Sequence, residues 1–132
     1  METIAVRVEE LVQQSATRAR GQQAYSRLLQ RLAQKSRRPL RVILDLSGAR
    51  LVTGSFLDQL VIKTSQAFAD EGIQFVFRFA RKEGADKLAR VCGLRGVRCR
   101  YQVGPLGQVR LTRKREEKRG EPSEYPGALF TT

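Results

Sequence analysis

The chain has 132 residues, enough for one domain with a hydrophobic core, and its 25 Lys and Arg against 13 Asp and Glu give a net charge of +12. No apolar run approaches the roughly 18 residues that a membrane span needs, and the acidic start of the chain does not resemble a signal peptide. These features exclude a membrane-spanning protein and predict a cytoplasmic one.

Hydrophobic periodicity predicts alternating strands and helices over residues 1–103. The predicted elements, in chain order, are a strand over 3–8, a loop over 15–21, a helix over 22–35, a strand over 40–46, a short strand over 50–52, a helix from 55 to 71, a strand over 73–79, a helix over 84–92 and a strand over 97–103. The apolar run at 40–46 is typical of a strand buried on both faces. This order predicts an α/β fold with a single mixed, mainly parallel sheet of four to five strands and about three helices.

Residues 104–132 form a second region with a weaker pattern. A further hairpin strand is predicted within residues 107–112. The residues after it are basic and polar, with too little apolar surface to offset the entropy of ordering them, so they predict a flexible tail.

The chain has no histidine and two cysteines, Cys92 and Cys99. Without His, neither a Ser–His nor a Cys–His pair is available for nucleophilic catalysis. Two cysteines are too few for a structural zinc site or a disulfide framework, and both are expected to be reduced, small, buried apolar residues. The sequence therefore predicts a protein that is not an enzyme and that holds no metal or cofactor.

The excess positive charge lies mostly in residues 1–103 and predicts an electropositive surface. Such a surface attracts nucleic acid, acidic proteins or phosphorylated groups. Arg18 and Arg20 precede a predicted helix, where they either bind an anion together with backbone amides or lie in an exposed loop. Three groups of arginines are candidates: Arg18 with Arg20, Arg37 with Arg38 and Arg41, and Arg95 with Arg98 and Arg100.

Residues 42–60, VILDLSGARLVTGSFLDQL, resemble the STAS superfamily and are closest to the bacterial STAS-like domains, in which a strand ending in Leu-Asp precedes a turn, Ser-Phe and an apolar helix. The superfamily includes anti-sigma-factor antagonists, whose Asp-Ser-Ser-Gly segment aligns with residues 53–56. Ser55 then matches their phosphorylated serine, whereas Thr53 replaces the acidic residue and Phe56 the glycine. The resemblance covers residues 3–103 and implies a STAS-like fold with a regulatory or scaffolding role.

Two interpretations of Ser55 follow. As the first residue of Ser-Phe-Leu-Asp, it matches a capping pattern and would cap the second helix. The resemblance instead implies that Gly54, Ser55, Phe56 and Asp58 face a protein partner, with phosphorylation of Ser55 as a switch. The expected partner is a kinase, an anti-sigma-like ATPase or a subunit of a complex, and the alternative function is nucleic-acid binding.

Asp45 lies at the end of a predicted buried strand, a position where α/β proteins often place active carboxylates. A hydrolase that uses Asp45 is the remaining alternative. The sequence favours a structural role, in which the Asp45 side chain accepts hydrogen bonds within the turn that contains Ser47 and Gly48.

Overall fold

The structure is a computed structural model that describes residues 2–34, 39–65 and 71–113, and this part of the chain forms one sheet of five strands with three α-helices. In chain order the elements are β1 (Glu2–Arg7), a 3-10 turn η1 (Val8–Glu10), α1 (Arg18–Leu32), β2 (Leu40–Asp45), α2 (Gly54–Thr64), β3 (Ile73–Phe79), α4 (Lys82–Arg95), β4 (Arg100–Val103) and β5 (Arg110–Leu111). The predicted α/β class with a mixed, mostly parallel sheet is confirmed.

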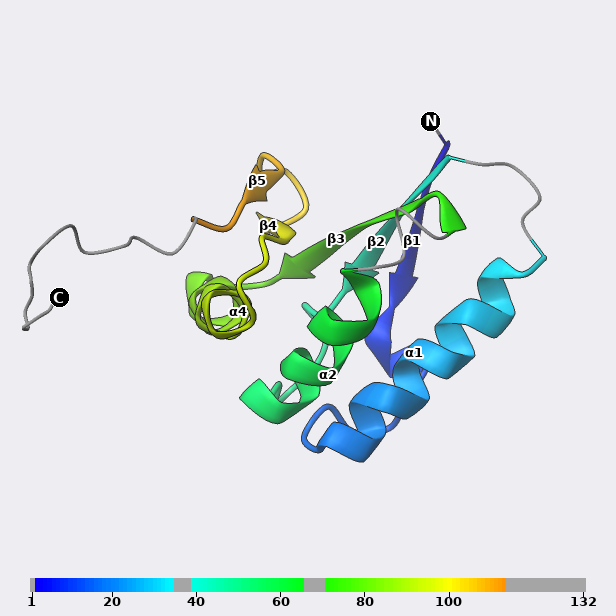
Figure 1. Cartoon of the computed structure of the whole chain (residues 1–132), viewed down its shortest axis with the longest axis horizontal. Coiled ribbons are helices and arrows are strands. Elements are labelled where there is room, and N and C mark those ends of the chain that lie inside the picture. The colour runs from blue at the N-terminus through cyan, green and yellow to red at the C-terminus, as the bar shows by residue number, and fades with distance from the viewer. Residues whose placement is uncertain (1, 35–38, 66–70, 114–132) are drawn as a thin grey trace, which may run out of the picture.

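The strands lie in the sheet in the same order as in the chain. The pairs β1–β2, β2–β3 and β3–β4 are parallel, and β5 pairs with β4 in the antiparallel direction. Because parallel crossovers are right-handed, this order places the connecting helices on one face of the sheet. In Figure 1, α1 and α2 lie side by side on the same side of the strands, and α4 is seen end-on.

Burial alternates along β2, which shows that the helices cover one face of the sheet. Leu40, Val42 and Leu44 are fully buried, whereas Arg41, Ile43 and Asp45 on the other face are half-buried. None of the described helices packs on that second face, which is called the uncovered sheet face below. The prediction that this strand is buried on both faces was therefore wrong.

The core lies between the sheet and the three helices. It is mainly aliphatic, with phenylalanines contributed by β3 and α2. Each helix contributes residues at helical spacing, which explains why periodicity located all three. The largest fully buried side chains include Leu28, Phe56, Leu60, Phe77 and Leu88.

Helix α1 begins within the segment that was predicted as a loop. Thr17 is its N-cap, and the Thr17 hydroxyl accepts a hydrogen bond from the Arg20 backbone N–H at 3.1 Å. Gly21 is buried where α1 meets α2, and a Cβ atom at this position would lie 2.8 Å from the Phe56 carbonyl oxygen and 3.0 Å from Gln59 Cβ. The prediction of a loop over 15–21 was wrong because Gly21 serves close helix packing.

Several other element bounds also differ from those predicted. Residues 50–52 form only one isolated bridge, between Ser15 and Val52, and not a strand of the main sheet. Helix α4 begins at Lys82 and continues to Arg95, and Gly96 ends it with a φ of 68°. Strand β4 begins three residues later than predicted, at Arg100. The predicted continuation of α2 through 66–70 and the predicted tail after residue 113 lie outside the described residues.

Candidate functional site

The starts of α1 and α2 are joined by backbone and side-chain hydrogen bonds. The backbone N–H of Thr53 donates to the Ser15 carbonyl at 3.0 Å, and its hydroxyl donates to the Ala16 carbonyl at 2.7 Å. The same hydroxyl accepts from the Phe56 backbone N–H at 3.2 Å, so Thr53 is the N-cap of α2. The prediction that Ser55 is the cap was wrong, because the helix begins at Gly54 and its N-cap is two residues earlier, at Thr53.

Thr53→Ala is expected to lower the free energy of unfolding by about 1 kcal/mol, because it removes the cap and the hydroxyl's hydrogen bond to the Ala16 carbonyl. Ser55→Ala should change it by less than about 0.5 kcal/mol, because Ser55 is exposed in the first turn. Urea unfolding of the two variants compares them directly. A larger loss for Ser55→Ala would contradict the assignment of the cap.

The four residues of the predicted partner-facing surface have different surroundings. Ser55 is exposed, and Gly54 and Asp58 are half-buried. Phe56 is fully buried in the core, because its position on α2 points toward the sheet. Phe56 is therefore a packing residue, and its inclusion in a partner-facing surface was wrong.

Asp58 in α2 forms ion pairs with two arginines, Arg18 of α1 and Arg95 of α4. Its carboxylate accepts from Arg95 Nε at 2.7 Å and Nη2 at 2.6 Å, and from Arg18 Nη1 at 2.7 Å. The hydrogen bonds from Arg95, and then the one from Arg18, lower the pKa of Asp58 to about 2. Three residues named from the sequence thus come together, as a link between α1, α2 and α4. We call them the Asp58 cluster.

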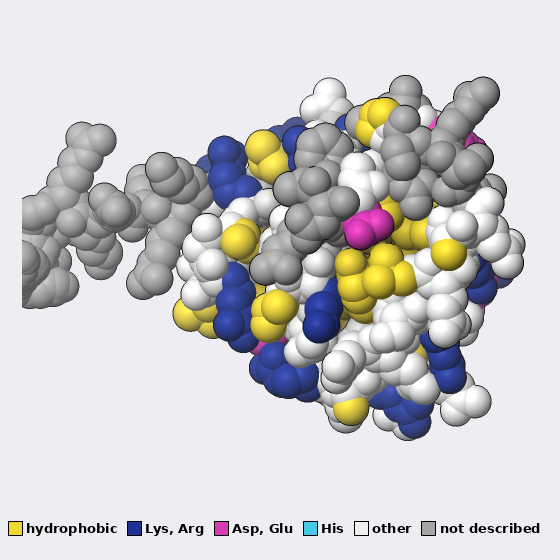
Figure 2. Space-filling model, turned by 45° about the vertical axis from the view of Figure 1, so that its right-hand side comes forward, with side chains coloured by type: hydrophobic (Ala, Val, Ile, Leu, Met, Phe, Trp, Pro, Cys, Tyr) yellow, Lys and Arg dark blue, Asp and Glu magenta, His cyan; other side chains and the backbone are white. Residues whose placement is uncertain are grey.

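The other candidate arginines do not form one continuous surface. Arg20 donates to Gln23 Oε1 at 2.8 Å, and Arg98 donates to the Thr112 carbonyl at 2.9 Å. Arg100 lies on the uncovered sheet face, opposite Leu111 of β5. On the face shown in Figure 2, the Lys and Arg side chains lie in separate groups. Arg37 and Arg38 lie outside the described residues.

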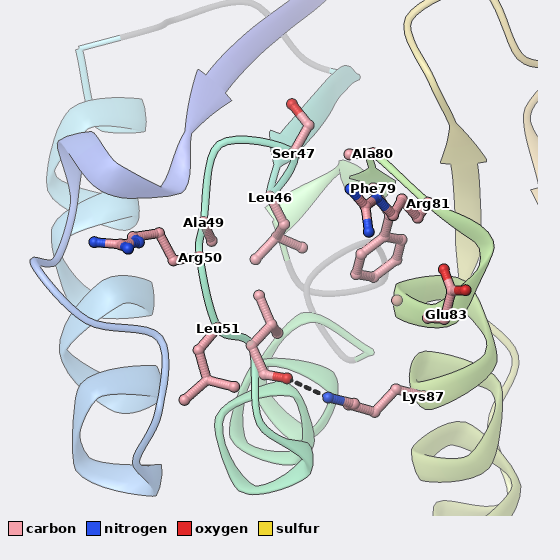
Figure 3. A pocket seen from close by; sticks show the side chains of 12 residues that line it. Leu46, Ser47, Ala49, Arg50, Leu51, Phe79, Ala80, Arg81, Glu83 and Lys87 are labelled. Carbon is pink, nitrogen blue, oxygen red and sulfur yellow. Dashed lines mark hydrogen bonds between the residues drawn. The ribbon is translucent and has the colours of Figure 1, made fainter.

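A cavity of about 570 Å³ opens between the 46–52 connection and the start of α4. It lies outside the carboxyl ends of β2 and β3, beside the segments that follow these two strands. In Figure 3, Leu46 and Phe79 point toward the centre of the cavity, and Arg50 points away from it. Lys87 crosses from α4 and donates to the Val52 carbonyl at 2.6 Å.

The edges of this cavity carry charge and exposed apolar surface. Arg50 and Arg81 are exposed, Lys87 is half-buried, and Glu83 supplies a negative charge. Leu51 has 58% of its surface exposed beside the α2 start. Sequence reasoning missed Leu51, Arg81 and Lys87, although the position of the cavity after two predicted strands was an available signal.

Asp45 has the structural role that the sequence favoured. Its carboxylate accepts from the Ser47 backbone N–H at 2.9 Å and from the Ser47 hydroxyl at 2.6 Å. Arg78 Nη1 lies 3.7 Å from the same carboxylate. The prediction that Asp45 caps this turn is confirmed.

Comparison of the chain with protein-family models, with curated proteins and with solved structures finds no match. The resemblance to STAS-like domains therefore rests on residues 42–60 and on the order of elements. Within the described residues, no helix is both long and apolar enough to cross a membrane.

Proposed function

We propose that this domain is a non-enzymatic, cytoplasmic binding module of a regulatory or scaffolding complex, and that it holds a segment of a protein partner beside the start of α2. One observation carries the proposal. The cavity at the carboxyl ends of β2 and β3 combines an apolar floor, Leu46 and Phe79, with positive charge at its edges. This combination suits a peptide segment with one apolar anchor residue flanked by acidic side chains.

The exposure of the cavity favours a macromolecular partner over a small molecule. Half of the residues that line it are exposed, whereas small-molecule sites bury about 70–90% of their ligand. Leu51, at the edge of the cavity, adds exposed apolar surface three residues before the α2 start. A bound protein segment would cover both the cavity and Leu51, with its carboxylates near Arg81 and Lys87.

The surroundings of the polar groups support binding over catalysis. The Ser47 hydroxyl donates to Asp45, and the Lys87 ammonium donates to a backbone carbonyl. Among the described residues that line the cavity, Glu83 is the one carboxylate, and it is exposed. A pair of groups that share a proton, as general acid–base catalysis requires, is not present in this lining.

Ser55 is the proposed switch of the same surface, as the resemblance to STAS domains implies. A phosphate on Ser55 would lie near the positive end of the α2 dipole. Asp58 is three residues further along the same helix face and holds Arg18 and Arg95. The phosphate would compete with Asp58 for these arginines and would add negative charge where an acidic partner docks.

Site-specific photocrosslinking in the cell that expresses the protein tests this proposal. A photoreactive amino acid at position 51 should yield a discrete protein adduct, and the same group at the highly exposed position 106 should not. Arg81→Glu should reduce the adduct at least about tenfold, because it reverses a charge at the cavity. Arg90→Glu, at an exposed position within α4 that does not line the cavity, should leave the adduct unchanged. Equal adducts from positions 51 and 106 would overturn the proposed site.

The Ser55 switch is tested on the same adduct. Ser55→Asp should lose the partner and Ser55→Ala should keep it, with both variants folded by circular dichroism. Identical recovery of the adduct by both variants would leave the binding site in place and remove the switch.

Nucleic-acid binding is the second candidate, and the uncovered sheet face is the observation that favours it. Arg7, Arg41, Arg78 and Arg100 lie on this face. Two of them are paired with acids, Arg7 with Glu10 at 3.3 Å and Arg78 with Asp45 at 3.7 Å. A photoreactive group at exposed Thr3, on the same face, would then give adducts that nuclease removes. Binding that weakens steeply with salt would support this candidate in place of the protein partner.

A further inference from the structure

The two cysteines meet in the core. Cys92 Sγ in α4 lies 2.8 Å from Cys99 Sγ, and both thiols are free and buried. Gly96 ends α4 in the left-handed conformation, and the backbone N–H of Val97 donates to the Cys92 carbonyl at 3.0 Å. This reversal of the chain brings residue 99 back against the last turns of the helix.

Thr112, which follows β5, fixes the position of Cys99. The Cys99 backbone N–H donates to the Thr112 hydroxyl at 3.0 Å, and the Thr112 backbone N–H donates to the Cys99 carbonyl at 2.9 Å. Arg98 Nε adds a hydrogen bond to the Thr112 carbonyl at 2.9 Å. The two thiols are thus held in contact from both sides, by α4 and by the β5 segment.

The two thiols differ in acidity. The hydrogen bond with Cys99, and more weakly that with the Thr112 hydroxyl, lowers the pKa of Cys92. The hydrogen bond with Cys92, together with burial, raises the pKa of Cys99. We therefore assign Cys92 as the nucleophile of the pair.

We propose that Cys92 and Cys99 are a covalent oxidation site that takes up an intramolecular disulfide, with a hydroperoxide as the oxidant. The sulfur atoms need to approach by only about 0.8 Å to reach the disulfide distance of about 2.05 Å. Hydrogen peroxide is small enough to reach the thiols when Thr112 moves away from them, because Thr112 follows an edge strand of only two residues.

The reaction proceeds in two displacements. The Cys92 thiolate attacks one peroxide oxygen, so that an S–O bond forms, the O–O bond breaks, and the departing hydroxide takes up a proton to become water. The Cys99 sulfur then attacks the Cys92 sulfenic sulfur, so that the S–S bond forms and the S–O bond breaks, with release of a second water. Two thiols lose two protons and two electrons, and one peroxide is reduced to two waters.

Intact mass spectrometry of the full chain after treatment with hydrogen peroxide tests the proposal. The folded protein should lose about 2 Da and form no intermolecular disulfide. A thiol reagent added after denaturation should then find no free thiol, and treatment with dithiothreitol should restore both. A gain of about 16 or 32 Da without this loss, or a disulfide-linked dimer, would overturn the intramolecular site.

Two single variants test the division of roles. Cys99→Ser leaves the Cys92 sulfenic acid without a resolving thiol, so a dimedone adduct should form. Cys92→Ser leaves the less acidic thiol, and its oxidation should be at least about tenfold slower. Equal rates in the two variants would overturn the assignment of Cys92 as the nucleophile.

An equilibrium measurement tests whether the fold prepares the site. In glutathione buffers the wild-type dithiol should oxidise with an equilibrium constant at least about tenfold larger when the protein is folded than when it is unfolded in urea. Equal constants would overturn the claim that the fold prepares the site.

Discussion

Gly21→Ala is expected to lower the free energy of unfolding by about 1 to 3 kcal/mol, although alanine is the better helix former. The added Cβ would lie 2.8 Å from the Phe56 carbonyl oxygen and 3.0 Å from Gln59 Cβ. The first of these atoms belongs to the α2 backbone and cannot rotate away, so the two helices must separate. Urea unfolding at neutral pH measures the loss.

Gly93→Ala is the matched control, because Gly93 also lies inside a helix but a Cβ there would meet nothing within 4 Å. Without a clash, the intrinsic helix preference should dominate and raise the free energy of unfolding by about 0.5 to 1 kcal/mol. The two substitutions are thus expected to have opposite signs. A stabilising effect of Gly21→Ala would show that α1 and α2 do not pack as closely as described.

Asp58→Asn is expected to lower the free energy of unfolding by about 1 to 2 kcal/mol at pH 7 and by less than about 0.5 kcal/mol near pH 2. The arginines lower the folded-state pKa of Asp58 to about 2 from an ordinary value of 3.8. A carboxyl group with a lowered folded pKa contributes stability that is present above its unfolded pKa. This stability is lost as the pH falls from 3.8 through about 2. Urea unfolding of the wild type and of Asp58→Asn across this pH range shows whether their free energies of unfolding converge.

Glu10 provides the control for this effect, because it also holds two arginines but is more exposed. Arg31 Nη1 lies 2.6 Å from Glu10 and Arg7 Nε 3.3 Å, and these contacts lower the pKa of Glu10. The Glu10 side chain is 40% exposed and that of Asp58 is 14% exposed. Solvent screening should make Glu10→Gln the weaker substitution. An equal effect of both would mean that the Asp58 cluster is no more protected than a surface ion pair.

The order and type of the main elements could be predicted because they depend on local patterns. The apolar positions of α1 and α2 recur at helical spacing, and the apolar run of β2 is short and bounded by Pro39 and Gly48. The run did not reveal that one face is uncovered. Ile43 is apolar on that face, so the sequence alternation that would indicate a half-exposed strand is broken.

The errors at the helix starts have a common cause. Gly21 and Ser55 belong to residue types that often mark loops and caps, and both were interpreted from local sequence alone. Their observed roles depend on contacts between segments distant in the sequence. Gly21 packs against the α2 backbone, and the cap Thr53 bonds to Ala16, 37 residues earlier.

The candidate site was predicted in part. Arg18, Asp58 and Arg95 were all named from the sequence, but their pairing links three helices and no spacing rule predicts it. The contact between Cys92 and Cys99 depends on the chain reversal at Gly96 and on Thr112. The cavity depends on how the 46–52 connection lies against α4, which is set by tertiary packing.

The strand order has a consequence for how this chain is made. Each new parallel strand pairs with the strand just before it, so no strand waits for a later one to be inserted between them. The sheet can therefore grow from the amino-terminal edge while the ribosome is still translating the rest. The last additions are β4 and the β5 segment that ends at Thr112. Because these strands are added last, the hydrogen bonds between Cys99 and Thr112 are among the last contacts of the sheet to form.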